Sequence, residues 1–594
     1  MELKAEFLGN LKRTAYCGEF RIENVGQQAT VFGWVQRRRD LGQLIFIDLR
    51  DRTGIVQLAF DDTTDREVFE KAFSVRSEYV LAATGIVRER SSKNMEISTG
   101  EIEIEVKELK VLALSETPPF EILENSNAGE DIRLKYRYLD LRRPDLQKNI
   151  LMRHKVAKVT RDYFDENGFI EIETPMLIKS TPEGARDFLV PSRIHKGSFY
   201  ALPQSPQLYK QLSMVAGFDR YIQIARCFRD EDLRADRQPE FTQIDLEMSF
   251  VDVEDVLSIG EGFIKRLFKD VLNVDIPMPL PRLTYKEAME RYGSDKPDTR
   301  YGMEITDISD IVKNCGFGVF TNAINGGGSV RAIVAKDAVN VLTRKEIDKL
   351  TEMVRGIGGK GIAFARRTKD GTTCSFQKFM TEDEMNAIYE RTDCQVGDVL
   401  LVMADTTDRH LLPHLGALRS TVAKKLNIIP DTFNFLWVVE FPFFEYNDET
   451  GNWDAMHHPF TSPLDECLDY LETDKGNVRA KAYDLVLNGI ELCSGSIRIT
   501  NPELQNRMFA LLGMSDEEAH EKFGFLLDAF RFGPPPHGGM GLGLDRICML
   551  MMKRDNLRDV IAFPKVQNAS ELMTMAPANV DNAQLKELGI KLDL

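Results

Sequence analysis

The sequence lacks the features that would tie it to a membrane, a structural metal or a disulfide framework. No run approaches the roughly 20 consecutive apolar residues of a membrane-spanning helix, and the opening stretch MELKAEFLGNLKR has no continuous apolar core like that of a secretion signal. The 8 cysteines are scattered, without a CxxC pair or a Cys/His cluster at zinc spacing. We therefore expect a soluble, cytoplasmic protein with no membrane partner and no structural zinc.

The common nucleotide-binding loops are also missing. The nearest approach to GxxxxGK[ST] is GIGGKG at 356–361, where Gly361 stands in place of the required serine or threonine. No GxGxxG motif opens a helix after a strand. A P-loop or dinucleotide-binding enzyme therefore has no support, and any bound nucleotide must be held chiefly by arginines.

Composition places the chain among ordinary globular proteins of several domains. Of its 594 residues, 43% are hydrophobic and 28% are charged, and the net charge is −17. At roughly 150 residues per domain, this length predicts about three or four domains. The acidic balance argues against a protein that coats DNA or other nucleic acids indiscriminately, but it permits a locally basic site.

The order of hydrophobic runs predicts a multidomain α+β protein. Five short runs rich in Val, Ile and Phe near the N-terminus are typical of a small closed β-barrel. Helical and strand patterns mix further on, and FLWVVEFPFFEY at 435–446 reads as one buried strand. The expected segments are 1–118 (barrel), 119–145 (polar linker), 146–294 and 421–565 (two parts of a mixed core), 295–420 (an inserted α/β module) and 566–594 (a C-terminal extension).

The expected barrel has a basic face. Arg37 opens a run of three arginines, while Phe46 and Gln57 lie in the next two runs. An aromatic ring and an amide beside such cations are suited to stack on and read an unpaired base. A solvated basic turn next to a core phenylalanine would give the same pattern, so these residues alone leave both interpretations open.

Two arginines stand in settings suited to phosphate. Arg229 lies in CFRDE (227–231) before a polar loop, and Arg546 closes HGGMGLGLDR (537–546), whose glycines let backbones approach closely. An arginine fork binds phosphate or carboxylate oxygens in pairs and keeps its charge at any working pH. Either arginine alone would equally fit a surface ion pair.

A third sequence motif, together with the segments around Arg229 and Arg546, resembles a known family. With ENGFIEIETPML at 166–177, FRDED and GLGLDR resemble motifs 1, 2 and 3 of the class II aminoacyl-tRNA synthetases. TPEGARDFLVPS, LPQSPQLYKQ, HHPFT and SIRI narrow the resemblance to the bacterial-type aspartyl-tRNA synthetases, over about residues 14–590. The resemblance implies an N-terminal OB-fold that binds the anticodon, a catalytic core built on an antiparallel sheet, and an inserted GAD-like domain.

The same resemblance implies the reaction and the partners. Family members use ATP and Mg²⁺ to convert L-aspartate into aspartyl-adenylate, which the terminal ribose of tRNA(Asp) then attacks. The first motif builds a C2 homodimer around its proline, which is Pro175 here. Leu41 resembles the residue of enzymes restricted to tRNA(Asp). Charging of tRNA(Asn) as well, or a non-catalytic RNA-binding protein of synthetase fold, are the alternatives.

Motif positions transfer one by one to this sequence. Arg229 corresponds to the arginine that bridges the α-phosphate and the reacting carboxylate, Glu231 to the acid that reads adenine, and Arg546 to the arginine on the γ-phosphate. These three are the expected catalytic residues. Asp484 and Glu491 correspond to the carboxylates that carry Mg²⁺. The other expected ATP contacts are Asp230, Gln238, Glu491, Gly543, Leu544 and Asp545.

Substrate selection in this family rests on charge. By resemblance, Arg498 and Lys210 hold the side-chain carboxylate of aspartate, with His457 beside it. Asparagine would leave both cations under-paired, so we expect the site to reject it. The remaining expected aspartate contacts are Arg229, Glu183, Gln207 and Asp245, and the expected anticodon contacts are Arg37, Phe46 and Gln57.

Overall fold

A computed structural model describes residues 3–181, 184–447 and 450–593. The chain divides into two compact units, which are described separately. The first comprises 1–155, 232–239 and 548–585, and the second comprises 156–231, 240–547 and 586–594. Across the described ranges, no helix is both long and apolar enough to cross a membrane.

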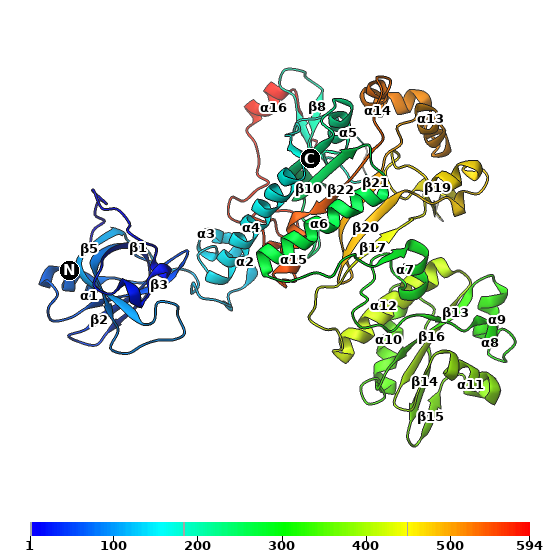
Figure 1. Cartoon of the computed structure of the whole chain (residues 1–594), viewed down its shortest axis with the longest axis horizontal. Coiled ribbons are helices and arrows are strands. Elements are labelled where there is room, and N and C mark those ends of the chain that lie inside the picture. The colour runs from blue at the N-terminus through cyan, green and yellow to red at the C-terminus, as the bar shows by residue number, and fades with distance from the viewer. Residues whose placement is uncertain (1–2, 182–183, 448–449, 594) are drawn as a thin grey trace. The chain divides into compact units, whose positions relative to one another are not determined.

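The first unit contains a closed five-stranded barrel with the order β1-β2-β3-β5-β4, drawn in blue in Figure 1. Its interior is filled by alternate residues of the strands, such as Ile45, Ile47 and Leu49 of β2. The predicted five-stranded barrel is thereby confirmed. The strands are β1 (Gln28–Asp40), β2 (Ile45–Asp51), β3 (Gly54–Phe60), β4 (Val80–Glu89) and β5 (Ile102–Ala113), with helix α1 (Arg66–Ser74) between β3 and β4.

The segment after the barrel is more ordered than a polar linker. It forms α2 (Glu130–Lys135) and α3 (Arg137–Asp140) before the long helix α4 (Pro144–Glu166). Asp140 is fully buried and accepts hydrogen bonds from Arg137 at 2.7 Å and Arg143 at 2.9 Å. The charged composition suggested solvent exposure, but mutual pairing lets these groups be buried.

The second unit is built on an eight-stranded sheet with the order β11-β17-β20-β21-β22-β10-β9-β6. The pairs from β17 to β9 are antiparallel, while the two edge strands β11 and β6 pair in parallel. The strands are β6 (Ile170–Glu171), β9 (Arg220–Phe228), β10 (Glu240–Ser249), β11 (Arg282–Thr284), β17 (Phe435–Val439), β20 (Ala482–Leu487), β21 (Ile490–Ile497) and β22 (His537–Gly543).

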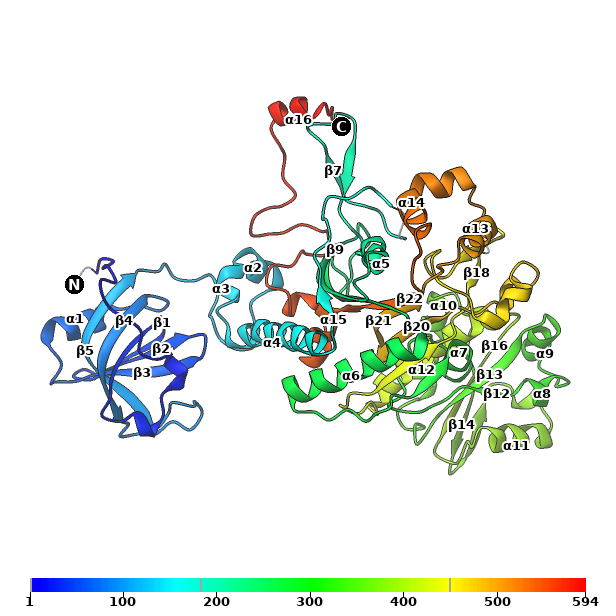
Figure 2. The same ribbon diagram turned by 45° about the horizontal axis from the view of Figure 1, so that its top comes forward.

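Helices lie on the two faces of this sheet. Helix α6 (Val253–Leu272) packs on one face, where Gly260 approaches Trp437 and Met540 so closely that a β-carbon would lie 2.9 Å from the methyl of Met540. Helix α5 (Gln207–Val215) packs on the opposite face against β9 and β10, as Figure 2 shows. The face of the sheet covered by α6 is apolar, and the polar side chains lie on the opposite face, which α5 covers.

One predicted strand is broken in the structure. Residues 435–446 form β17 and then, after a break, β18 (Phe444–Asn447), which pairs with β19 (Asn452–Ala455) instead of the main sheet. Glu440 has a φ of 54°, and Pro442 has no N–H to donate to a neighbouring strand. The prediction of a single strand was wrong because proline and this left-handed residue end the pairing.

The inserted segment folds around a second, five-stranded sheet with the order β12-β13-β16-β14-β15. Its neighbouring strands pair antiparallel, and helices cover both faces (Figure 1). The boundaries of the inserted domain remain predictions. Its strands are β12 (Thr306–Asp307), β13 (Ser329–Ala335), β14 (Ala363–Thr368), β15 (Gly371–Cys374) and β16 (Val399–Asp405); α8 (Ser309–Val312), α9 (Gly318–Asn325) and α11 (Glu382–Arg391) lie on one face, and α10 (Arg344–Gly356) and α12 (Asp408–Leu426) on the other.

Several smaller elements complete the chain. Helix α7 connects β11 to the insertion, and α15 follows β22 directly. The remaining elements are β7 (Leu189–Pro191), β8 (Phe199–Ala201), α7 (Tyr285–Tyr292), α13 (Pro502–Leu511), α14 (Asp516–Phe530), α15 (Leu544–Met551), α16 (Asn582–Leu588) and six short 3-10 helices.

Candidate functional site

Strand alternation gathers several expected site residues on the α5 face of the large sheet. The side chains of directly paired residues on antiparallel strands point to the same face of the sheet. The strand pairing therefore places one residue from each of five strands side by side on that face. From β9 to β20 this row consists of Gln223, Asp245, Gly541, Ser494 and Asp484. The expected aspartate contact Asp245 and the expected magnesium ligand Asp484 therefore share one face.

A β-bulge brings Glu491 to the same face. In a regular pairing of β20 with β21, Val486 would face Leu492 and the side chain of Glu491 would point toward α6. The register shifts at this point so that Val486 pairs with Glu491. The shift turns Glu491 toward the side of the sheet that carries Asp484, whose carboxylate it influences electrostatically.

Glycines of β22 leave room for neighbouring side chains. A β-carbon at Gly539 would lie 2.2 Å from Oε2 of Glu247, so glycine is what allows that carboxylate to lie over the strand. At Gly541 a β-carbon would lie 3.3 Å from Oδ1 of Asp245. The glycine-rich sequence before Arg546 therefore shapes the polar face.

The residues that follow β22 are fixed by the sheet. After Gly543, the side chain of Leu544 is buried at the start of α15. The buried carboxylate of Asp545 accepts a hydrogen bond from the backbone N–H of Thr242 at 2.7 Å. Nη1 of Arg546 donates to the carbonyl of Glu491 at 2.7 Å. Two expected ATP contacts, Arg546 and Glu491, are thus brought together.

Four buried charges form an ionic cluster on this face: Lys210 from α5, Asp245 and Glu247 from β10, and Arg498, which directly follows β21. Nζ of Lys210 lies 2.9 Å from Oδ1 of Asp245 and 3.3 Å from Oε2 of Glu247. Arg498 contacts both carboxylate oxygens of Glu247, through Nε at 2.9 Å and Nη2 at 3.2 Å. Each of these side chains is at most 3% exposed.

Protein carboxylates already pair both cations of the cluster, Lys210 with Asp245 and Glu247, and Arg498 with Glu247. Burial raises the pKa of Glu247, but the charges of Arg498 and Lys210 outweigh it and hold that pKa below its usual value. Burial holds the pKa of Asp245 above its usual value despite Lys210. Glu247 was not among the expected residues, although it stands two positions after Asp245, the spacing of one strand face.

Two neighbouring histidines adjoin the ionic cluster. Burial and the charge of Arg498 lower the pKa of His457 to about 4. The same two causes lower the pKa of His458 well below its usual value, and its Nε2 contacts Nη1 of Arg498. The ring of His457 packs edge-on against Phe441 at 5.2 Å between centroids. Both imidazoles are therefore neutral at pH 7.

Several expected site residues carry buried polar atoms without a hydrogen-bond partner. Within the described ranges, 14 buried side-chain nitrogen or oxygen atoms have no hydrogen-bond partner. Five of them belong to expected site residues: Gln207 Nε2, Arg229 Nε, Asp245 Oδ2, His457 Nε2 and Asp484 Oδ1. Because buried polar groups in folded proteins are normally paired, these five atoms are candidates to bind a polar ligand.

Arg229 stands at the end of β9. Its guanidinium lies over the ring of Phe241, 5.1 Å from the centroid, which holds the side chain above the strand that carries Asp245. The next residue, Asp230, forms an ion pair with Arg186, whose Nε lies 3.8 Å from Oδ2 of Asp230. Glu231 is half-buried, and the expected contact Glu183 lies outside the described residues.

Two other expected residues, Gln238 and Pro175, are not among the residues on the α5 face described above. Gln238 belongs to the first unit, where its amide is bound on both sides to the backbone of Lys565: Nε2 donates at 3.0 Å and Oε1 accepts at 2.8 Å. Pro175 is exposed, and exposed apolar neighbours accompany it. Those neighbours are Ile170, Met176 and Leu177.

The carboxylates of Asp484 and Glu491 lie close enough to interact by charge. Burial, the charge of Glu491 and the charge of Asp295 raise the pKa of Asp484 well above its usual value, which Lys296 partly offsets. A divalent cation would relieve this repulsion, and the unpartnered Oδ1 of Asp484 is a hard oxygen ligand. The described residues contain no group of three or more such ligands. Two carboxylates fit Mg²⁺ that takes its other ligands from phosphate and water.

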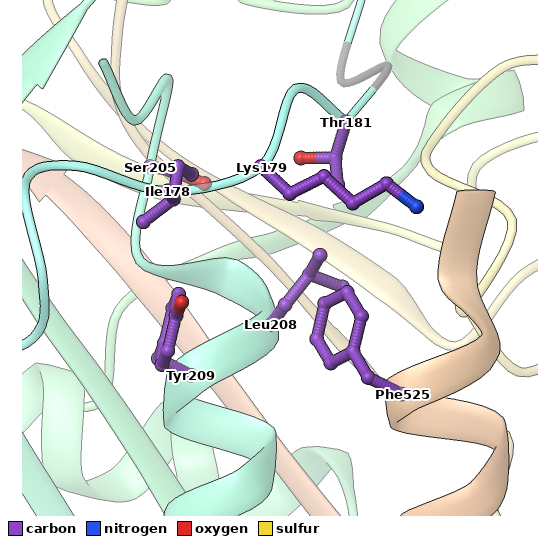
Figure 3. A pocket seen from close by; sticks show the side chains of 7 residues that line it. All are labelled: Ile178, Lys179, Thr181, Ser205, Leu208, Tyr209 and Phe525. Carbon is purple, nitrogen blue, oxygen red and sulfur yellow. The ribbon is translucent and has the colours of Figure 1, made fainter. Parts of the chain in front are cut away.

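A separate small pocket lies where α5 meets α14. Its volume is about 110 Å³, below the roughly 300–1,000 Å³ of ordinary ligand pockets. Figure 3 shows Leu208 and Tyr209 of α5 facing Phe525 of α14 across it. The other lining residues are Ile178, Lys179, Thr181 and Ser205. This pocket is too small for ATP, so the open face of the sheet is the better candidate.

The three expected anticodon residues lie on one outer face of the barrel. Arg37 and Gln57 both pair with Asp48 of β2, and Phe46 stands two residues before Asp48. The amide of Gln57 accepts from Nη2 of Arg39 at 2.8 Å and donates to Glu103 at 2.6 Å. The ring of Phe46 is half-buried, and the guanidinium of Arg39 lies over it, 5.8 Å from the centroid. The structure therefore brings Arg37, Phe46 and Gln57 together.

Comparison with known proteins agrees with this geometry. A family model described as "tRNA synthetases class II (D, K and N)" matches residues 129–567, and one described as "OB-fold nucleic acid binding domain" matches 29–112. Among solved structures, the aspartyl-tRNA synthetase of Entamoeba histolytica has a TM-score of 0.58 at 20% identity, covering 94% of this chain and 92% of that one. At this identity the likeness concerns the fold.

Curated relatives are much more similar in sequence. The aspartate–tRNA ligase of Ruminiclostridium cellulolyticum is 60% identical over 99% of both chains. The aspartate–tRNA(Asp/Asn) ligase of Caldanaerobacter subterraneus subsp. tengcongensis is 58% identical over 99% of this chain and 100% of the relative. With the class II core, the OB-fold barrel and identity at this level over its whole length, the chain belongs to the aspartate–tRNA ligase family of class II tRNA synthetases.

Proposed function

We propose that the protein activates L-aspartate with ATP and transfers the aspartyl group to the terminal ribose of tRNA(Asp). The main structural support is the set of five unpartnered buried atoms around the ionic cluster, on one face of the class II sheet. An ordinary structural cluster would pair these atoms internally. L-aspartate, with one ammonium group and two carboxylates, and ATP beside it would pair them instead.

The ionic cluster would select aspartate. Oδ2 of Asp245 suits the ammonium group, with Gln207 and Glu183 as further contacts by resemblance, while the unpartnered Nε2 of Gln207 is a donor and suits a carboxylate oxygen. Arg498 and Lys210 suit the side-chain carboxylate by their positive charge. To bind it, they would share donors with Glu247, Asp245 and Ser496, which already contact them. Asparagine brings no anion to these cations, so the charge of the ligand decides the selection.

Arg229 would carry the activation step. An oxygen of the aspartate α-carboxylate attacks the α-phosphorus of ATP, and the bond from phosphorus to the pyrophosphate oxygen breaks, with no proton transferred. The guanidinium of Arg229 would bridge the carboxylate and the α-phosphate and stabilise the charge that builds on phosphorus. Arg546 would bind the γ-phosphate and Glu231 the adenine amino group. The further ATP contacts would be Asp230, Gln238, Glu491, Gly543, Leu544 and Asp545.

Mg²⁺ would be held by Asp484 and Glu491, where it supplies positive charge between phosphate oxygens. The bulge that turns Glu491 toward Asp484 favours this assignment. His457 would help to orient the bound aspartate. Its imidazole is neutral and its ring packs against Phe441. A neutral imidazole adds a hydrogen-bonding group beside aspartate without competing with its carboxylate for Arg498.

The barrel would bind the anticodon of tRNA through Arg37, Phe46 and Gln57. Whether tRNA(Asn) is also charged distinguishes two candidate functions. The relative named aspartate–tRNA(Asp/Asn) ligase supports the broader activity, whereas Leu41, exposed in the turn after β1, resembles the restricted enzymes. We favour restriction to tRNA(Asp).

A cytoplasmic C2 homodimer completes the proposal. The exposed apolar residues around Pro175 support an interface at motif 1, because a monomer would leave Ile170, Met176 and Leu177 in water. Size-exclusion chromatography with light scattering tests this state directly, and a purely monomeric protein would contradict it.

The function is tested by parallel aspartylation of purified tRNA(Asp) and tRNA(Asn) with ATP, Mg²⁺ and labelled aspartate. Charging of tRNA(Asp) alone is the expected result. Charging of both would establish the broader ligase. Charging of neither, with normal folding, would favour an RNA-binding protein without catalysis.

A further inference from the structure

The segment between α7 and the inserted sheet contacts both helix α12 of the insertion and the core. The backbone carbonyl of Asp298 accepts a hydrogen bond from Nη2 of Arg419 at 2.7 Å. Nδ2 of Asn434 donates to the hydroxyl of Thr299 at 2.8 Å. A β-carbon at Gly489 would lie 3.0 Å from Cβ of Asp298, so this segment packs directly on the turn between β20 and β21. Residues 295–299, which we call the base of the insertion, therefore have a fixed place beside the strands that carry Asp484 and Glu491.

This anchoring puts a lysine at the expected magnesium carboxylates. Nζ of Lys296 lies 3.9 Å from Oε2 of Glu491 and 3.8 Å from Oδ1 of Asp295. Both distances exceed those of hydrogen bonds, and the side chain is 47% exposed. Lys296 is held near Glu491 by charge, but its ammonium group is not locked in one geometry.

The location of this ammonium group suits a polyphosphate. Arg546, proposed to bind the γ-phosphate, donates to the carbonyl of Glu491 at 2.7 Å. Lys296 and Arg546 therefore both adjoin Glu491, and a phosphate chain bound by Arg546 would come near Lys296. The negative charges of Glu491 and Asp295 both act on Asp484, so an incoming polyphosphate needs a local cation in addition to the metal.

We propose that Lys296 binds the β- and γ-phosphates of ATP and the pyrophosphate that leaves, so that the base of the insertion forms part of the ATP site. This role rests on the adenylate chemistry proposed above. The lysine transfers no proton. Its charge offsets the negative charge that collects on pyrophosphate as the bond to the α-phosphorus breaks.

Binding measurements on the full-length protein test this role. Isothermal titration calorimetry with Mg-ATP, Mg-pyrophosphate and AMP compares the parent with Lys296→Ala. We expect Kd to rise about tenfold for Mg-ATP and Mg-pyrophosphate, the usual scale for one charge-assisted contact, while Kd for AMP stays within twofold. Lys296→Arg should restore most of the affinity, and Lys286→Ala, an exposed lysine of α7, is the matched control.

A purely structural lysine would give a different result. If Lys296 only balanced the charge of the carboxylates, Lys296→Ala would lower the melting temperature and raise Kd for AMP, ATP and pyrophosphate by similar factors. That result would overturn the proposal. Unchanged Kd values would also overturn it. If the alanine variant does not fold, Lys296→Gln provides the same comparison. A parent protein that binds neither ATP nor AMP would instead refute the proposed function.

In steady-state ATP–pyrophosphate exchange, Lys296→Ala should raise KM for ATP and for pyrophosphate and leave KM for aspartate unchanged. A KM for aspartate that rises in parallel would assign Lys296 to the general architecture of the site and contradict the proposal.

Discussion

Glu247 and Arg498 form a two-point ion pair inside the class II sheet, with contacts of 2.9 and 3.2 Å. Glu247 also approaches Nζ of Lys210 at 3.3 Å. One carboxylate therefore orients both cations that are proposed to bind the aspartate side chain. Its position over β22 depends on Gly539, which leaves the space that a side chain would fill.

Glu247→Gln should impair both stability and aspartate binding. The change keeps the shape of the side chain but leaves Arg498 and Lys210 with less compensating charge in a buried site, which costs about 3–5 kcal/mol. We expect a lower melting temperature and a KM for aspartate at least tenfold higher in exchange assays, with KM for ATP unchanged. The control is Glu240→Gln, at the outer end of β10, where the paired Arg226 is 40% exposed. A variant with the parent KM for aspartate would show that Arg498 needs no such partner.

Arg229→Ala should abolish aspartate-dependent ATP–pyrophosphate exchange. Removing one preorganised donor that stabilises transition-state charge costs about 10²–10³ in rate, and Arg229 is proposed to act on two charged groups at once. Circular dichroism and melting temperature should stay close to those of the parent. Arg226→Ala, on the same strand but of opposite parity and paired with Glu240, serves as the control. Normal exchange in Arg229→Ala would remove this residue from the mechanism.

Phe46→Ala should separate tRNA recognition from activation. Stacking of a base on an aromatic ring contributes about 1–3 kcal/mol, so KM for tRNA should rise roughly 5- to 100-fold in aminoacylation. Exchange without tRNA should be unaffected. Phe73→Ala removes another exposed phenylalanine of the first unit, packed near Arg38, and is expected to keep the parent KM. A Phe46→Ala protein defective in exchange would contradict an anticodon role.

The barrel was predictable because its strands carry a strong local signal. Each strand alternates apolar and polar residues, and the five runs match β1 to β5 within a few positions. Local signals failed where tertiary context decides. Residues 435–446 read as one apolar run, yet Glu440 and Pro442 divide it. The charged segment around Asp140 reads as solvated, yet mutual pairing buries it.

The site was only partly predictable for similar reasons. Motifs identify Arg229, Arg498 and Lys210 as residue types, but no motif shows which protein carboxylate pairs with each cation. Glu491 reaches its face through a bulge, and a register shift cannot be deduced from alternation in a single strand. Lys296 lies about 200 residues before Glu491, and their proximity depends on how the insertion is anchored to the core.

Buried histidines should make the protein less stable in mild acid. Burial and Arg498 lower the pKa of His457 to about 4 from an ordinary value of 6.5. As pH falls below 6.5, the unfolded chain binds a proton at this residue and the folded chain does not, so the free energy of unfolding decreases until about pH 4. The cost from His457 alone is at most ~3 kcal/mol, and His458 acts in the same direction.

Urea denaturation at several pH values measures this effect. The unfolding free energy of the parent should fall between pH 6.5 and 4, and His457→Gln should fall less steeply because it removes one proton-binding group from the unfolded chain. His154→Gln, at an exposed position of α4, is the matched control and is expected to keep the parent slope. Equal slopes for the parent and His457→Gln would mean that His457 takes up its proton as readily in the folded protein as in the unfolded chain, and would contradict the lowered pKa of His457.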